Sequence, residues 1–380
     1  MATEKLFYSD CMRSEFSATV TGCTQVPGGW QVTLDRTAFY PEGGGQACDT
    51  GTLGDAVVTD VQEKEEQLLH LCSKPLAVGS RVSGRIDFDR RFDLMQQHTG
   101  EHIVSGIIHA RYGWQNSGFH VGKQFMEVDF DGPIPPEDIP LIEALANQVI
   151  WENRPVKCWY PSEEALAGMV YRTKRALPWP VRIVEVPDVD RCACCGIHVP
   201  FTGMAGPVKL ISCVKFHQGV RIEMLCGKRA MAYMNEIFAQ NKGVSQALSA
   251  KPTQTAEAAK KLLDTLAAEK FRCAGLEKQV FSHIAESYVN RGAVVHFEPG
   301  LSGAGLRELA EQIAAKCGGR AAVFSGEDGQ YGYCLVQFGG DLRGFNKEMT
   351  AALCGRGGGK PEFQQGTLQT TRQQIEDFFQ

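Results

Sequence analysis

Two histidines in the stretch QQHTGEH, residues 96–102, stand at the spacing of a metal site. His98 and His102 are four residues apart, so on a helix both imidazoles lie on one face and can reach the same ion. With Glu101 directly before the second histidine, the stretch also matches the H-x-x-E-H pattern of one class of zinc peptidases. In that chemistry Glu101 is the general base, and a carboxylate further along the chain completes the metal site. The pattern alone does not distinguish the metal site of a peptidase from a metal site of another kind.

A second cluster of metal-ligating residue types lies in RCACCGIH, residues 191–198. Cys194 and His198 fall in a turn-rich segment between predicted strands. Added to the two helical histidines, they make four nitrogen and sulfur donors, the set that binds a tetrahedral Zn²⁺. We therefore predict one zinc ion per chain, bound by His98, His102, Cys194 and His198. The alternative to a zinc site is that these cysteines are ordinary buried thiols. Cys192 and Cys195 also form a C-x-x-C pair, so a redox pair is a further alternative.

The composition is that of an ordinary globular protein. Apolar residues make up 43% and charged residues 22% of the 380 residues, and the formal net charge is −5. This length predicts two or three domains. Nucleic-acid contacts must then use local basic patches rather than overall charge. The candidate patches are YRTKR at 171–175, Arg90, Arg91, Arg343, Lys347, Arg356 and Lys360.

The compartment is predicted from what the sequence lacks. No apolar run approaches about 18 residues, so we predict no membrane span. The stretch MATEKLFYSDCMRSEF lacks the apolar core of a signal peptide. Without a secretory signal, the 14 scattered cysteines are better explained as reduced thiols than as disulfides. We therefore predict a cytoplasmic protein.

The elements that must position these residues predict an α+β fold in four parts. The parts are an N-terminal β-barrel-like domain at 1–88, a zinc-binding domain with helices on an antiparallel sheet at 89–238, a linker helix at 239–286 and a small C-terminal α/β domain at 287–380. The assignment rests on short β-branched runs before residue 88 and on strong helix formers after residue 240.

Within the second part, apolar periodicity predicts the individual elements. Apolar residues and the two histidines recur at three- and four-residue spacing over 90–112, which predicts the helix that carries the metal motif. A second helix is predicted at 135–156, where proline precedes an apolar face. Alternating residues predict strands at 123–132 and 178–186 and a hairpin at 206–227.

Four segments of the chain, in the same order, resemble one protein family. They read TAFYPEGGGQACDTGTL, RIDFDRRFDLMQQHTGEHIVSGI, RCACCGIHVPFTGMAGPVKLIS and GVRIEMLCG. The chain resembles the alanyl-tRNA editing proteins of the AlaX type, long form, which are free-standing relatives of the editing domain of alanyl-tRNA synthetase. The resemblance runs roughly from residue 25 to residue 235. The tail GRGGGKPEFQQG is similar to the glycine-rich end of the DHH-associated C-terminal domain that long members carry.

The resemblance implies a trans-editing hydrolase that removes serine or glycine from mischarged tRNA-Ala by zinc-assisted ester hydrolysis. It implies the same four zinc ligands and makes 89–238 the editing domain. The family's glycine-rich motif falls on Gly43, Gly44, Gly45 and Gln46, and Thr37 becomes a candidate contact for the serine hydroxyl. The implied partner is tRNA-Ala carrying serine or glycine. A homodimer through the linker helix or the C-terminal domain is also implied.

The chemistry of the candidate pocket residues fits this role. The glycines at 43–45 allow a ligand to approach the backbone closely. Thr37 and Gln46 can hydrogen-bond a hydroxyl, and a site that does so discriminates strongly against a substrate without one. His120, in NSGFHVG, is a further pocket candidate. Turn and strand structure is the alternative explanation for these residues.

Two positions depart from the family pattern. Glu101 stands where glutamine or threonine is common, and we take it as a candidate catalytic base, with a solvent-facing carboxylate as the alternative. The family's CGGTH is CCGIH here, so Cys195 adds a thiol that could compete for the metal.

Two other functions remain open from the sequence. A zinc peptidase of the H-x-x-E-H type would lose activity when Glu101 becomes glutamine and would be indifferent to Cys194→Ala. A non-catalytic tRNA-binding protein with a structural zinc would unfold over 90–235 on metal removal, without any activity to lose.

Overall fold

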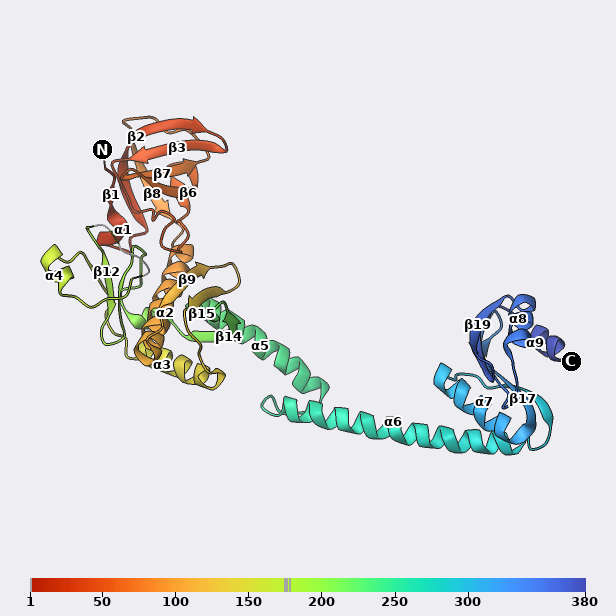
Figure 1. Cartoon of the computed structure of the whole chain (residues 1–380). Helices are drawn as coiled ribbons and strands as arrows, with labels where there is room; N and C mark the ends of the chain where they lie inside the picture. Colours follow the sequence, from red (N-terminus) through yellow and green to blue (C-terminus); the bar gives the residue numbers. More distant parts are fainter. Residues whose placement is uncertain (1, 174–176, 178) are drawn as a thin grey trace. The chain divides into compact units, whose positions relative to one another are not determined.

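The computed structural model describes residues 2–173, 177 and 179–380, which fold into two compact units, Met1–Asn241 and Lys242–Gln380 (Figure 1). Helices and mainly antiparallel sheets occur in both units, which confirms the predicted α+β class. The finer division at 88/89, 238/239 and 286/287 stays a prediction. Among the described residues, no helix is both long and apolar enough to cross a membrane.

The first 86 residues are mostly strand, with short β1 (Glu4–Lys5), α1 (Leu6–Ser9) and β4 (Arg36–Thr37) beside a larger sheet. That sheet contains β2 (Glu15–Val26), β3 (Gly29–Leu34), β5 (Gly51–Leu53), β6 (Ala56–Lys64), β7 (Gln67–Cys72) and β8 (Arg81–Ile86). Antiparallel pairing in the order β2-β3-β7-β6-β5-β8 returns to β2 and closes the sheet into a barrel. Alternating residues of β2 and β3, such as Val20, Val32 and Leu34, fill its interior.

The next part packs two helices against a four-stranded antiparallel sheet. The helices are α2 (Phe88–Tyr112) and α3 (Ile139–Trp151), the latter preceded by a 3-10 turn η1 (Pro136–Asp138). The strand order is β14 (Val208–Phe216), β15 (Gly219–Cys226), β10 (Met126–Phe130) and β9 (Asn116–Val121). Ile103, Ile142 and Ile222 belong to the shared core of these elements. The helices predicted at 90–112 and 135–156 and the hairpin predicted at 206–227 are confirmed, with slightly different ends.

A smaller three-stranded sheet carries the second metal motif. Its strands are β11 (Lys157–Trp159), β12 (Ile183–Val186) and β13 (Asp190–Ala193), with the short helix α4 (Glu163–Ala167) between β11 and β12 and the 3-10 turn η2 (Thr202–Ala205) after β13. An apolar cluster that includes Phe7, Met95 and Ile197 joins the first 86 residues, α2 and the loop after β13. The metal motifs therefore meet where these three parts pack together.

The predicted linker helix at 239–286 is in fact two helices, α5 (Gly227–Ala247) and α6 (Thr255–Glu286). The break coincides with Ser249, whose φ of 50° lies in the left-handed region, and with Pro252, which lacks the N–H that a helix interior needs. Helix α5 also starts earlier than predicted, directly after β15 at Gly227.

The second unit ends in a five-stranded sheet with helices on both faces. Its strands, in spatial order, are β16 (Gly292–Phe297), β17 (Gly318–Glu327), β18 (Gln330–Val336), β20 (Phe363–Leu368) and β19 (Gly355–Lys360). Val323 packs toward α7 (Gly303–Cys317), whereas its neighbour Phe324 packs toward α8 (Arg343–Ala352) and α9 (Arg372–Phe379). This alternation is the two-residue period of a strand buried on both faces.

His70 in β7 should make this fold sensitive to mild acid. Burial lowers the pKa of this imidazole from its usual 6.5 to about 4, and its ring bonds Thr37 Oγ1 at 2.9 Å and the Val32 carbonyl at 3.1 Å. The unfolded chain then binds the extra proton between pH 6.5 and 4, so the free energy of unfolding falls as pH falls through this window, by about 3 kcal/mol at most. We expect the stability difference between the wild type and His70→Gln, measured by unfolding at each pH, to shrink from pH 7 to pH 4. A constant difference would contradict this.

Candidate metal centre

Helix α2 brings the first metal motif into the interior. The Asp87 side chain caps its start by accepting a hydrogen bond from the Arg90 backbone N–H at 3.2 Å. Gly113 ends it in the left-handed conformation, with φ of 78°. His98, Glu101 and His102 are all at least nine-tenths buried between these ends. The solvent-facing alternative for Glu101 is therefore wrong.

The loop after β13 brings the second motif to the same place. Arg182 donates from Nη1 to the carbonyls of Cys194, at 3.0 Å, and Gly196, at 2.7 Å, and its guanidinium lies over the ring of Tyr8. A Cβ on Gly196 would lie 2.1 Å from His98 Cε1, so only glycine lets the loop approach that ring. Arg182 thus fixes the loop backbone, and Gly196 lets that backbone lie against His98 of α2.

One donor atom from each of the four predicted ligands lies within 4.8 Å of the others: His98, His102, Cys194 and His198. Cys194 Sγ is 3.4 Å from His98 Nε2 and 3.6 Å from His198 Nε2. Two donors on one tetrahedral zinc ion stand about 3.5 Å apart, given the usual zinc–nitrogen and zinc–sulfur bond lengths. The donor types and their spacing therefore fit zinc.

The Nδ1 atoms of the three histidines contact side chains outside the cluster, so the Nε2 atoms face the cluster. His98 Nδ1 donates to Gln46 Oε1 at 2.8 Å, and His102 Nδ1 donates to Asp190 Oδ2 at 2.8 Å. The third, His198 Nδ1, is 3.4 Å from Thr99 Oγ1. Such bonds fix the tautomer that leaves the Nε2 lone pair for a metal.

The electrostatics also suit metal binding. Burial alone would raise the pKa of the Cys194 thiol, but the imidazoles of His98, His102 and His198 around it hold that pKa well below its usual value, which favours the thiolate. Burial lowers the pKa of His198 to about 3, which keeps that imidazole neutral. The pKa of Asp190 is about 2, because its bonds to His102 and Arg172 outweigh burial, which acts in the opposite direction.

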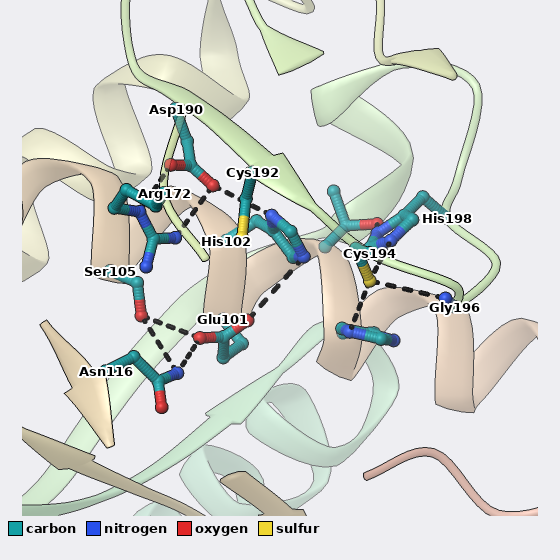
Figure 2. Close-up of polar contacts among 12 residues, drawn as sticks. Glu101, His102, Ser105, Asn116, Arg172, Asp190, Cys192, Cys194, Gly196 and His198 are labelled. Carbon is teal, nitrogen blue, oxygen red and sulfur yellow. Dashed lines mark hydrogen bonds and ion pairs between the residues drawn. The ribbon is translucent and has the colours of Figure 1, made fainter. Parts of the chain in front are cut away.

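A cavity of about 410 Å³ opens beside this cluster. Its walls include Gly44, Gly45, His98, Glu101, His102, Ser117, Gly118, Phe119, Arg172, Cys192, Cys194 and Cys195. Figure 2 shows Glu101 beside His102, with Ser105 and Asn116 on its far side. Glu101 Oε1 accepts hydrogen bonds from Ser105 Oγ, at 2.7 Å, and from Asn116 Nδ2, and Glu101 Oε2 is 3.8 Å from His102 Nε2. The cavity thus brings a buried carboxylate and the metal donors together.

The glycine-rich turn predicted to lie in the pocket is partly there. Gly44 and Gly45 line the cavity, and both have φ in the left-handed region, at 61° and 83°. Gly43 instead pairs with Gln46 in the turn's backbone hydrogen bonds, at 3.0 Å. The Gln46 side chain orients His98 and does not belong to the cavity wall.

Two other predicted pocket residues do not line the cavity. Thr37 is fully buried, and its hydroxyl contacts His70 Nε2 and accepts from the Phe39 N–H at 3.1 Å. His120 is exposed on β9, while the preceding Phe119 faces inward and stacks on His98 with ring centroids 4.9 Å apart. The two-residue alternation of the strand explains this exchange, because neighbouring side chains point to opposite faces.

The structure also corrects two of the predicted basic patches. Arg91 is fully buried and paired with Asp49, so it is not a phosphate contact. In the patch at 171–175, Arg172 is buried against Asp190, and residues 174 and 175 lie outside the described residues. The C-terminal candidates Arg343, Lys347, Arg356 and Lys360 are exposed, and Arg343 is paired with Asp341.

Asp190, which the sequence analysis missed, should control metal affinity through His102. Replacing it with asparagine removes the charge that stabilises the Nδ1–H of His102, and we expect zinc affinity to fall about 10- to 100-fold. Competition with a zinc-binding dye measures this. The matched control is Asp188→Asn, two residues earlier and with a side chain 94% exposed, which should bind zinc as the wild type does. Equal affinities for all three proteins would contradict the role of Asp190.

Known proteins resemble this chain in sequence. Two family models match: tRNA synthetases class II (A) over residues 7–90, and the threonyl and alanyl tRNA synthetase second additional domain over residues 181–223. Alanine–tRNA ligase of Pyrococcus abyssi is 30% identical over 96% of this chain and 42% of its own length. Alanyl-tRNA editing protein Aarsd1 of Rattus norvegicus is 31% identical over 67% of this chain and 66% of its own.

The chain thus spans about two fifths of the length of the ligases that it matches. Among solved structures, the C-Ala domain of Aquifex aeolicus alanyl-tRNA synthetase matches 22% of this chain and 86% of that chain, at 15% identity and a TM-score of 0.20, too low to support a structural comparison. The sequence relatives and both family models agree, and the chain belongs to the family of alanyl-tRNA editing proteins and the related region of alanine–tRNA ligases.

Proposed function

We propose that this chain is a trans-editing hydrolase that releases serine or glycine from mischarged tRNA-Ala in the cytoplasm. The observation that carries the proposal is the cavity of about 410 Å³ with four zinc-type donors and the buried carboxylate of Glu101 in or directly behind its wall. An aminoacyl ester has a carbonyl to polarise and needs one water to be activated, and this cavity offers a group for each task. The names of the relatives support the choice of tRNA-Ala.

The overall reaction is a simple ester hydrolysis. The oxygen of one water bonds to the carbonyl carbon, the bond from that carbon to the ribose oxygen breaks, and the ribose oxygen leaves with a proton. His98, His102, Cys194 and His198 would hold Zn²⁺. Because four protein ligands fill a tetrahedral coordination sphere, the ion when bound would supply positive charge beside the ester carbonyl. The products are a free amino acid and a tRNA with a free ribose hydroxyl.

Glu101 would carry out the proton transfer, because its carboxylate lines the cavity near His102. Ser105 and Asn116 fix one of its oxygens, so the carboxylate is held in one orientation inside the cavity. We assign it the role of general base that takes a proton from water and returns it to the ribose oxygen. Gly44 and Gly45 leave room for the backbone of the cavity wall to approach the aminoacyl group.

The peptidase alternative fits the donor set less well. It needs a carboxylate as the third protein ligand beside the two helical histidines. Here Cys194 and His198 are placed with those histidines, and the nearby Asp190 is bonded to Nδ1 of His102 and to Arg172. A thiolate and an imidazole therefore take the place that a peptidase would give to a carboxylate.

A substrate panel tests the reaction class. The purified 380-residue protein would be incubated with seryl-, glycyl- and alanyl-tRNA-Ala and with a quenched peptide library. The proposal expects loss of serine or glycine from tRNA-Ala, with the peptides intact. Cleavage of peptides without deacylation would replace the proposal with the peptidase.

We also propose that two chains pair through α6. Apolar side chains on this helix that are about half exposed, Leu262, Leu266, Leu276 and Val280, recur at spacings of a helical seam, although Glu269 interrupts it. Light scattering in solution should give twice the chain mass, and a monomer at micromolar concentration would contradict this.

A further inference from the structure

Arg172 is fixed in place beside β13, the strand that leads into the loop with Cys194 and His198. Its backbone forms a parallel bridge with Cys192, its N–H donates to the Arg191 carbonyl at 2.7 Å, and its own carbonyl accepts from the Ala193 N–H at 2.9 Å. Its side chain is only 8% exposed. A guanidinium held this way from both backbone and side chain has little freedom to move.

Two of the three guanidinium nitrogens are occupied. Nε donates to Asp190 Oδ1 at 2.7 Å and Nη2 donates to Asp190 Oδ2 at 2.8 Å, a bidentate pair. Asp190 in turn accepts from His102, so Arg172 stands two hydrogen bonds from a metal donor.

The third nitrogen, Nη1, has no hydrogen-bond partner among the described residues. Figure 2 shows it directed away from Asp190, on the side of Ser105 and Glu101. Arg172 lines the same cavity as the metal donors. Nη1 therefore presents two N–H donors to whatever fills that cavity.

We propose that Arg172 is a catalytic residue that donates from Nη1 to the carbonyl oxygen of the bound ester. This inference rests on the proposed function. As water adds to the carbonyl carbon, the π electron pair moves onto that oxygen and its negative charge meets a fixed, permanently charged donor. The pair returns when the bond to the ribose oxygen breaks, and the guanidinium keeps all its protons throughout.

The same residue has a positioning role through Asp190, and the two roles predict different results. If Arg172 only positions His102, its loss acts like the loss of Asp190 and shows in zinc affinity. If Nη1 also meets the oxyanion, its loss shows in kcat of protein that still carries one zinc ion per chain.

The test uses the zinc-loaded 380-residue protein and seryl-tRNA-Ala under single-turnover conditions. For Arg172→Ala and Arg172→Lys we expect kcat to fall about 10²- to 10³-fold, as for other oxyanion donors, with zinc stoichiometry retained. Millimolar methylguanidinium should restore part of the rate of Arg172→Ala and none of that of Arg172→Lys, where the lysine fills the space. Arg191→Ala is the matched control, since Arg191 is exposed, lies in β13 and pairs with Glu185.

Three outcomes would overturn the proposal. An active wild type with unchanged kcat in both variants would remove any role for Nη1. Loss of activity that follows loss of zinc, without rescue by methylguanidinium, would leave Arg172 a positioning residue. A wild type that deacylates no aminoacyl-tRNA would overturn the proposed function first and this inference with it. Thermal unfolding of each variant separates these results from a failure to fold, and Arg172→Lys keeps the charge beside Asp190 should the alanine variant unfold.

Discussion

Replacing Cys194 with serine is expected to remove zinc from the chain and to end deacylation. A serine hydroxyl does not ionise near neutral pH, so the cluster loses its one thiolate, while its three imidazoles remain. A catalytic metal contributes several kcal/mol to transition-state stabilisation, which corresponds to a loss of about 10³-fold or more in kcat. Metal analysis of the purified variant and single-turnover deacylation of seryl-tRNA-Ala measure the two effects.

The matched control is the neighbouring thiol. Cys195 is exposed, and its backbone carbonyl, not its sulfur, accepts the hydrogen bond from Tyr8 Oη at 2.8 Å. Cys195→Ser should therefore keep zinc. If Cys195→Ser lost zinc and Cys194→Ser kept it, the assignment of the sulfur ligand would be wrong.

Replacing Glu101 with glutamine should give the second largest effect and leave zinc in place. The amide keeps an oxygen that can accept from Ser105 and Asn116, so the side chain can hold its position, but it cannot take a proton from water. Loss of a general base lowers kcat by about 10²- to 10⁴-fold. Single-turnover rates of seryl-tRNA-Ala with a saturating excess of protein, together with metal analysis, measure this.

Ser105→Ala serves as the graded comparison for Glu101. It removes one donor to the carboxylate and leaves the base itself, so kcat should fall less than in Glu101→Gln. A Glu101→Gln variant that keeps the wild-type rate would show that the carboxylate is not the base.

The four metal donors could be predicted because each pair is local. His98 and His102 share one face of a helix, and Cys194 and His198 share one loop, so spacing alone identified each half. That the two pairs lie together was the one long-range inference. It followed from the preference of zinc for four ligands. The ends of α2 could also be predicted to within a few residues, since its periodicity and caps lie within one stretch of sequence.

The residues that support the donors could not be predicted in this way. Asp190 reaches His102 because β13 begins directly against α2 at Gly106, where a Cβ would lie 2.4 Å from the Val189 carbonyl. No spacing signal marks that approach. Arg172 was assigned to a basic surface patch, because a sequence does not show whether an arginine faces solvent or a buried carboxylate.

The glycine-rich motif illustrates the same limit. Its position in a tight turn followed from composition, but which side chain faces the cavity depends on how the turn is oriented against α2 and β9. A Cβ on Gly45 would lie 2.5 Å from Phe119, so the turn packs against the cavity wall there. Gln46 then points to His98 rather than to the cavity.

The most direct test of the central claim is the ratio of two hydrolysis rates on one zinc-loaded preparation. Wild-type protein with one bound zinc ion per chain would be mixed separately with seryl-tRNA-Ala and alanyl-tRNA-Ala, and the loss of labelled amino acid followed over time. We predict rapid loss of serine while alanine stays attached, and loss of that difference in Cys194→Ser. Equal, background rates for both substrates from folded, zinc-containing protein would contradict the assignment of this cavity to tRNA-Ala editing.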